Sequence, residues 1–145
     1  MLGKKIKYTD YNGVEREEKF YFNLSKAELL EMQLTKQGGM ETYLRRIVNE
    51  QDQVKIAEIF KMFITKSYGK KSDDGKRFIK SQELTDEFLQ SEAYSELYSE
   101  LIMDANAASA FINGIIPPAL AQAAEAELKK NGGKLPDLDE GDTNA

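Results

Sequence analysis

The residues that most constrain the fold of this chain run from 78 to 118, FIKSQELTDEFLQSEAYSELYSELIMDANAASAFINGIIPP. They hold the densest apolar pattern with helical spacing, and they end at two prolines, which cannot continue a helix. Serines or an aspartate stand at positions 81, 91 and 104, where each can cap a new helix. The stretch therefore predicts three consecutive helices. The middle one carries the clearest apolar face, at spacings i, i+3, i+4, i+7 and i+8: Tyr94, Leu97, Tyr98, Leu101 and Ile102.

Acidic side chains follow that middle helix one turn apart. Glu92, Glu96, Glu100 and Asp104 recur every four residues, with no lysine or arginine between them. Like charges at this spacing destabilise an isolated helix by about 0.2–0.5 kcal/mol per pair. Two interpretations remain open. The row is either a solvated helix face, with Glu92 favourable near the helix N-terminus, or a docking face for a basic partner.

Four large apolar residues lie near the end of the same stretch: Phe111, Ile112, Ile115 and Ile116. One hypothesis is that they bind a partner's helices or form the contact between copies of the chain. The alternative is that they close the core against Phe60 and Phe63. The candidate partner-binding residues are therefore these four together with Glu92, Glu96 and Glu100.

The N-terminal part of the chain predicts a β-hairpin. Residues 4–9 and 14–22 are rich in strand-forming residues, and Asp10-Tyr11-Asn12-Gly13 lies between them. Asn-Gly between such segments is a strong hairpin signal, because both residues accept the positive φ of a tight turn. A single hairpin is marginally stable alone, so we expect it to pack on the helices that follow.

Further helices are predicted between residues 25 and 69. Ser25 and Glu28 form a capping-box pattern for a helix that runs to about residue 36, and a second stripe covers residues 40–48. A third helix starts near Asp52 and runs to Gly69, with Phe60 and Phe63 on its apolar face. Residues 70–80 predict a charged connecting loop. Its Asp-Asp-Gly at 73–75 predicts a plain turn, because it lacks the ligand spacing of a calcium loop.

Together these patterns predict an α+β fold that is mainly α, with the N-terminal β-hairpin packed on a bundle of about five to seven helices. Residues 1–118 are expected to form a single globular domain. Residues 119–131 have the composition of a C-terminal helix that lies in solvent. Residues 132–145 are acidic and poor in large apolar side chains, so we expect a disordered tail.

The chain contains no cysteine and no histidine. The absence of cysteine excludes disulfides, thiolate metal sites and cysteine nucleophiles, and it fits a reducing cytoplasm. The absence of histidine removes the usual general base and the usual zinc ligand. No glycine-rich phosphate loop or nucleophile elbow occurs either. We therefore expect no enzymatic activity, no catalytic residues, no cofactor and no metal.

Charge and hydropathy restrict the class of partner. The net charge is −5, and the lysines and arginines are scattered, which argues against nucleic acid. No window approaches the eighteen or so uninterrupted apolar residues of a membrane span, and the Met-Leu-Gly-Lys-Lys start is not a signal-peptide core. We expect no membrane partner, and we expect the protein to stay in the compartment where it is made.

Four motifs occur along the chain in a distinctive order: YTDYNGVEREEKFYFNLSKAEL, SYGKKSDDGKRFIKS, EAYSELYSEL and FINGIIP. With these motifs the chain resembles the tail assembly chaperones of bacteriophages with long non-contractile tails that infect Gram-positive bacteria. The similarity covers roughly residues 4–118 and fades beyond Pro118.

The resemblance implies a non-catalytic, mainly helical protein that acts during phage assembly. It would bind the tape measure protein, keep it soluble, and recruit subunits of the major tail tube protein. The protein would work in the host cytoplasm and be absent from the mature virion, and we expect it to self-associate. The resemblance also implies that a programmed frameshift can yield a longer second product.

Three other classes of protein remain open. A structural head-tail joining or tail-terminator protein would be found in purified virions. An acidic DNA mimic would spread its carboxylates over a broad surface, whereas here they form one narrow row. An ordinary bacterial helical adaptor is distinguished by its genomic neighbours, because a long tape measure gene immediately downstream supports the chaperone.

Overall fold

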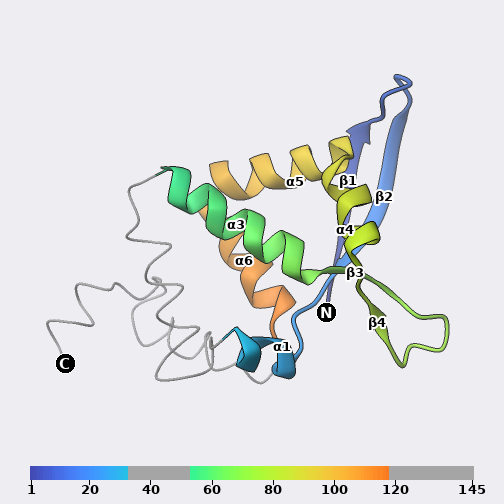
Figure 1. Cartoon of the computed structure of the whole chain (residues 1–145). Helices are drawn as coiled ribbons and strands as arrows, with labels where there is room; N and C mark the ends of the chain where they lie inside the picture. The colour runs from blue at the N-terminus through green and yellow to red at the C-terminus, as the bar shows by residue number, and fades with distance from the viewer. Residues whose placement is uncertain (33–52, 118–145) are drawn as a thin grey trace, which may run out of the picture. The chain divides into compact units, whose positions relative to one another are not determined.

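The computed structural model describes residues 1–32 and 53–117 (Figure 1). These residues belong to two compact units. Unit 1 contains residues 1–23 and 60–115, and the described part of unit 2 contains residues 24–32, 53–59 and 116–117. All the described strands lie in unit 1, in the order β1-β2-β3-β4. The predicted α+β, mainly helical fold with an N-terminal hairpin is confirmed, with five helices among the described residues.

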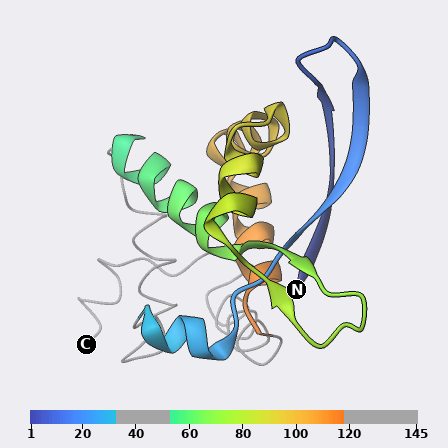
Figure 2. The ribbon, with the colours of Figure 1, turned by 45° about the vertical axis from the view of Figure 1, so that its right-hand side comes forward.

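The N-terminal hairpin consists of β1 (Leu2–Thr9) and β2 (Glu15–Phe22), which pair antiparallel along their whole length. The predicted turn joins them. The carboxylate of Asp10 accepts a hydrogen bond from the backbone N–H of Asn12 at 2.9 Å, and Gly13 has a φ of 79°. Figures 1 and 2 show the turn end of this hairpin extending beyond the helices of unit 1.

Alternation along the two strands separates an inner face from an outer face. Ile6 and Phe22 are buried on the inner face, where the ring of Phe22 meets the ring of Phe111 edge-on at 5.3 Å. Lys5, Lys7 and their cross-strand neighbours point outward and are exposed. One face of the hairpin therefore packs on helices, as expected for an antiparallel sheet that is wet on its other side.

The prediction of a charged connecting loop over residues 70–80 is wrong. The structure has two short strands there, β3 (Tyr68–Lys71) and β4 (Phe78–Ile79), which pair antiparallel. Strand β3 also pairs with the end of β2, which extends the hairpin to a four-stranded sheet. The turn itself forms as predicted, since the N–H of Gly75 donates to the carbonyl of Ser72 at 2.9 Å and Gly75 has a φ of 74°.

Two residues of unit 1 explain how β3 and β4 stay paired and attached to the neighbouring elements. A Cβ atom on Gly69 would lie 2.6 Å from the Ile79 carbonyl oxygen, so only glycine allows β4 to approach this closely. The Lys80 ammonium donates to the carbonyl oxygens of Asn23 at 2.7 Å and Lys66 at 2.8 Å. It thereby joins the residue after β2, the last turn of the preceding helix, and the end of β4.

The helices of the described chain begin close to the predicted positions, but the first one, predicted to run to about residue 36, ends at Glu31, with Met32 as its C-cap. They are α1 (Lys26–Glu31), α3 (Gln53–Ser67), α4 (Gln82–Leu89), α5 (Glu92–Met103) and α6 (Ala105–Ile115). The helix predicted to reach Gly69 ends at Ser67, because the next two residues enter β3.

Most of the predicted caps form. Ser25 and Glu28 make the reciprocal capping box of α1, and the Ser81 hydroxyl accepts from the N–H of Leu84 at the start of α4. Asp104 caps α6 through the N–H of Asn106 at 2.9 Å. Ser91 stands at the predicted N-cap of α5, but its hydroxyl donates to the carbonyl of Phe88 at 2.7 Å and satisfies the end of α4 instead.

The core of unit 1 lies where the inner face of the hairpin meets the helices. As predicted, Phe60 and Phe63 on α3 are buried, and so are Leu97 and Leu101 on α5. Gly114 of α6 lies against Leu2 of β1, with 2.9 Å between the position of a Cβ and a Leu2 methyl carbon. Close packing of α6 on β1 therefore depends on this glycine.

Several predictions fall outside the described residues. They are the stripe at 40–48, the cap at Asp52, the helix at 119–131 and the tail at 132–145. The predicted single domain of residues 1–118 stays a prediction.

Candidate partner-binding surface

The predicted apolar contact residues are buried. Phe111, Ile112, Ile115 and Ile116 are 2%, 1%, 0% and 2% exposed. The first three lie on the inward face of α6, and Ile116 follows that helix. This burial agrees with the alternative that they belong to a core. Their role as contacts for a partner or a second copy stays a prediction.

The acidic row on α5 meets the hairpin. Glu100 forms an ion pair with Lys4 of β1 at 2.8 Å, and Glu92 accepts a hydrogen bond from the Tyr11 hydroxyl at 2.7 Å. The bond to Glu92 raises the pKa of Tyr11, because it stabilises the protonated phenol. Glu96 is exposed and forms no ion pair with any described residue. Part of the row is therefore engaged within the chain, Glu100 by a cation and Glu92 by a neutral phenol, from residues 96 and 81 positions away in sequence.

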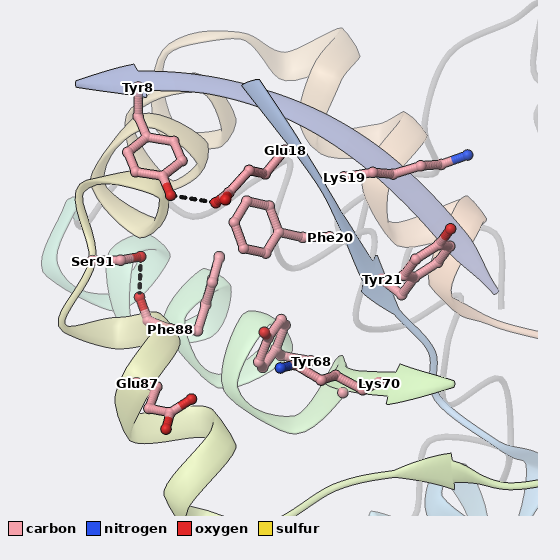
Figure 3. Close-up of a pocket in the computed structure, with 11 residues that line it drawn as sticks. Tyr8, Glu18, Lys19, Phe20, Tyr21, Tyr68, Lys70, Glu87, Phe88 and Ser91 are labelled. Atoms are coloured by element: carbon pink, nitrogen blue, oxygen red, sulfur yellow. Dashed lines mark hydrogen bonds between the residues drawn. The ribbon is translucent and has the colours of Figure 1, made fainter. Parts of the chain in front are cut away.

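Unit 1 also contains an aromatic hollow of about 390 Å³ beside strand β2 (Figure 3). It forms where β3 leaves β2. Only Tyr21 and Phe22 of β2 pair with β3, so residues 15–20 of β2 have an open edge on that side. The side chains around the hollow come from β1, β2, β3 and α4, and their rings are Tyr8, Phe20, Tyr21, Tyr68 and Phe88.

The rings of the hollow pack against one another. Tyr68 and Phe88 stack with centroids 4.5 Å apart and an interplanar angle of 16°. Phe20 packs tilted on Phe88 at 5.1 Å. Figure 3 shows these three rings forming its wall, with Tyr8 and Glu18 hydrogen-bonded at the upper end. Tyr68 and Phe88 are buried, so they support the half-buried ring of Phe20, which remains partly accessible.

Charged groups of both signs surround the rings. Glu18 and Glu87 line the hollow, and so does Lys70. The pKa of Tyr68 is raised, first by burial and then by the negative charges of Glu87 and Glu18. Lys19 also borders the hollow, but its ammonium lies 5.6 Å from the centroid of the Tyr21 ring, and Figure 3 shows it pointing away.

The tyrosines around the hollow and at the hairpin turn favour their protonated form. The phenols of Tyr8, Tyr11 and Tyr68 all have raised pKa values, the first two through hydrogen bonds to carboxylates and the third through burial. Within residues 1–32 and 53–117, no cluster of three or more acidic side chains could hold a metal ion. In the same residues no helix has the length and apolar character needed to span a membrane.

Sequence patterns missed the hollow. Helical spacing marks Phe88 as apolar, and strand alternation marks Phe20, but neither pattern shows that the two rings meet. The meeting depends on β3, which brings Tyr68 beside β2 and which the charged sequence at 70–77 concealed. The only available signal was the alternation of Phe20 and Phe22 on one face of a strand.

The whole chain was compared with known proteins. A family model described as "Phage tail assembly chaperone" matches residues 1–144, nearly the full length of the chain. Comparison with curated proteins and with solved structures found no match. The family match includes the hairpin, the described helices and the residues around the aromatic hollow. The chain therefore belongs to the phage tail assembly chaperone family.

Proposed function

We propose that this chaperone binds the tape measure protein of its phage, keeps it soluble, and recruits major tail tube subunits during tail assembly. It acts without catalysis in the host cytoplasm and leaves before the virion is complete. The observation that carries the proposal is the family match over residues 1–144. A tape measure protein is long and helix-rich, so a binding protein must cover apolar helix surface that would otherwise aggregate.

Two features of unit 1 support a role in protein binding. The aromatic hollow presents the half-buried rings of Tyr8, Phe20 and Tyr21, and aromatic side chains dominate the energetics of many protein interfaces. The exposed carboxylate of Glu96 lies one turn from Glu92 and from Glu100, both of which bond to the hairpin, and it can attract a basic side chain of a partner.

Co-expression tests the proposed function. The full chain is produced together with the tape measure protein encoded downstream, and the soluble fraction is analysed by size-exclusion chromatography. We expect the tape measure protein to remain soluble only when it co-elutes with the chaperone. An insoluble tape measure protein with no complex would contradict the holdase mechanism. Finding the chain in purified virions would favour a head-tail joining or tail-terminator role.

Variants then separate the predicted contacts. Glu96→Lys reverses an exposed, unpaired charge and should weaken capture of the tape measure protein without affecting folding. Lys26→Glu on α1 reverses another exposed charge and serves as the control. Ile116→Asp tests the apolar prediction. Ile116 is 2% exposed, so an aspartate there can unfold the chain. The circular dichroism spectrum of the Ile116→Asp variant must therefore first match that of the unmodified chain.

A longer product made by frameshifting is a separate part of the proposal. Mass spectrometry of the chaperone from infected cells would detect peptides that continue beyond the shared N-terminal region. Detection of the 145-residue product alone would remove this part and leave tape measure binding untouched.

A further inference from the structure

Strand β2 has an open edge beside the aromatic hollow. On one side β2 pairs with β1 along its whole length, but on the other side only Tyr21 and Phe22 pair with β3. Among the described residues, positions 15–20 of β2 therefore have no strand partner on that second side. An unpaired edge presents backbone donors and acceptors to which another extended segment can bind.

Hydrogen bonds at the two ends of β2 show which of its backbone groups face the open edge. The carbonyl of Val14 accepts from the N–H of Asp10 at 2.9 Å, so residue 14 faces β1. The N–H of Asn23 donates to the carbonyl of Ser67, directly before β3, at 2.7 Å, so residue 23 faces the other side. This direction alternates from residue to residue along an antiparallel strand. The backbone groups that face the open edge belong to three residues: Glu15, Glu17 and Lys19.

The aromatic hollow lies along this edge. Glu18 and Phe20 line it from the inner face of β2, and Tyr68 and Phe88 lie opposite them on β3 and α4. Figure 3 shows the Phe20 ring directed from β2 into the hollow, toward Phe88. Side chains of a strand added beside β2 would alternate between the two faces of the sheet. Those on the inner face would lie next to Phe20, so the hollow can accept an apolar side chain.

Free carboxylates follow the outer face of the same edge. Glu15 forms no ion pair with any described residue, and Glu17 has only an exposed contact with Lys7 at 4.0 Å. Lys19 is the cation of this row, but its side chain lies against Gly3 of β1. Cross-strand neighbours of opposite charge stabilise a sheet, so Glu15 and Glu17 favour basic side chains on the outer face of an added strand.

We propose that this edge binds an extended segment of a partner protein as an added strand. The segment has apolar side chains, including an aromatic ring, on its inner face and lysines or arginines on its outer face. It is extended because the backbone groups of a helix are bonded within the helix and cannot pair with an edge. The inference rests on the proposed function and deepens it, since it states what kind of segment the chaperone holds.

A designed peptide tests this chemistry on the full chain alone. The peptide TKVKFKVT, when extended, has lysines on one face and valines with a phenylalanine on the other. Its control, TEVEFEVT, replaces the lysines by glutamates. In fluorescence anisotropy the first peptide should bind saturably and the control at least about tenfold more weakly. Absence of binding by TKVKFKVT, or equal binding of both peptides, overturns the proposal.

Amide hydrogen exchange locates the added strand. With TKVKFKVT at saturation, the amides of Glu15, Glu17 and Lys19 should exchange more slowly, because each gains an acceptor. Lys5 and Lys7 are internal controls, since by the same alternation their N–H groups face the free side of β1. Protection at these two lysines, or binding without protection of the three edge amides, overturns the proposal. Protection that rises with the concentration of the chain alone would place a second copy at the edge and overturn it too.

Proline substitution removes one donor from the edge. Glu17→Pro deletes an N–H that faces the open edge and leaves the hydrogen bonds between β1 and β2 in place. It should weaken binding of TKVKFKVT at least about tenfold, because a ladder bond is lost. Lys7→Pro makes the matching change opposite Glu17, on the free side of β1, and should leave binding unchanged. Equal affinities of the two variants would contradict the added strand, and circular dichroism checks that both fold. If Glu17→Pro does not fold, the exchange experiment decides.

The peptide and the tape measure protein are tested separately, so the two proposals fail in different ways. A tape measure complex without peptide binding would overturn the added strand and leave the proposed function standing. Peptide binding without a tape measure complex would overturn the proposed function alone.

Discussion

At the scale of single residues, Asp10 organises the turn of the N-terminal hairpin. Its carboxylate accepts hydrogen bonds from the backbone N–H groups of Asn12 and Val14 and from the Arg16 guanidinium at 2.6 Å. The bond from Arg16 is the main cause of a lowered pKa, and the backbone bonds add to it. The folded hairpin therefore stabilises the ionised form of Asp10 relative to the protonated form.

The lowered pKa of Asp10 predicts a loss of stability in acid. The folded state binds this proton less readily than the unfolded state, so the contribution is fully present above the unfolded pKa, near 4. It is lost as the pH falls through the folded value. Asp10→Asn should therefore destabilise the chain at pH 6 and cost less at pH 3. Urea unfolding at both pH values measures the difference, and an equal cost at both would contradict the assignment.

Lys80 is the second residue whose role the structure makes explicit. Its ammonium donates to the carbonyl oxygens of Asn23 and Lys66, and the second of these lies in the last turn of α3, where a cation is favourable. Lys80→Met should lower the free energy of unfolding by about 1–3 kcal/mol, since two charge-assisted hydrogen bonds are lost. Lys71→Met is the control because Lys71 is exposed. Equal denaturation midpoints for the two variants would contradict the prediction.

At the scale of elements, Gly69 determines how closely β4 approaches β3. A Cβ at this position would meet the Ile79 carbonyl oxygen and a Phe78 ring carbon, both at 2.6 Å. Gly69→Ala should therefore destabilise unit 1 by about 1–3 kcal/mol, the usual cost of overpacking. It should also open the β3–β4 pairing, detected as faster exchange of the Ser72 amide hydrogen, which is bonded to the Arg77 carbonyl oxygen.

Gly3 provides a matched control for that change. It also lies in a strand, and a Cβ there would meet the Lys19 side chain at 2.5 Å. That contact is the flexible end of a lysine, which can move away at little cost. Gly3→Ala should therefore leave hydrogen exchange at the Ser72 amide unchanged. If both alanine variants destabilise the chain equally, close backbone approach is not what makes Gly69 necessary.

The elements also show what the sequence could predict. The first hairpin and helices α4–α6 carried local signals, namely a turn sequence with Asn-Gly, capping side chains and a regular apolar period. Strands β3 and β4 carried none, because β4 has only two residues and most of the residues around it are charged. They form because residues distant in sequence hold them: Tyr21 and Phe22 pair with β3.

The candidate surface was less predictable than the fold for the same reason. Periodicity identifies which face of a helix is apolar, and it correctly placed Phe60, Phe63, Leu97 and Leu101 inside. The periodicity of one helix contains no information on which charged residues of another element lie next to it. The pairing of Glu100 with Lys4 and the meeting of Phe20 with Phe88 arise only from the tertiary arrangement.

At the scale of the whole molecule, composition sets the response to pH. The chain has no histidine and no cysteine, so it lacks the side chains that ordinarily titrate near neutrality. The described carboxyls with shifted pKa values, Asp10 and Asp74, titrate below their usual range. The shifted phenols, including Tyr8 and Tyr68, titrate above about 10. Titration that couples to folding is therefore concentrated at the two ends of the pH scale.

A stability plateau follows from this distribution. Since ν, the number of bound protons, is nearly the same in the folded and unfolded states between pH 5.5 and 7, the free energy of unfolding should be constant there. The stabilisation by the Asp10 and Asp74 carboxylates is lost progressively as the pH falls below about 4. The phenols favour their protonated form when folded, so their contribution is lost as the pH rises through their raised pKa values. Urea unfolding of the full chain in constant ionic strength at pH 5.5, 6.2 and 7 measures the plateau. A sloping midpoint in this window would reveal a carboxyl with a strongly raised pKa, a group that would then become the first candidate for a functional site.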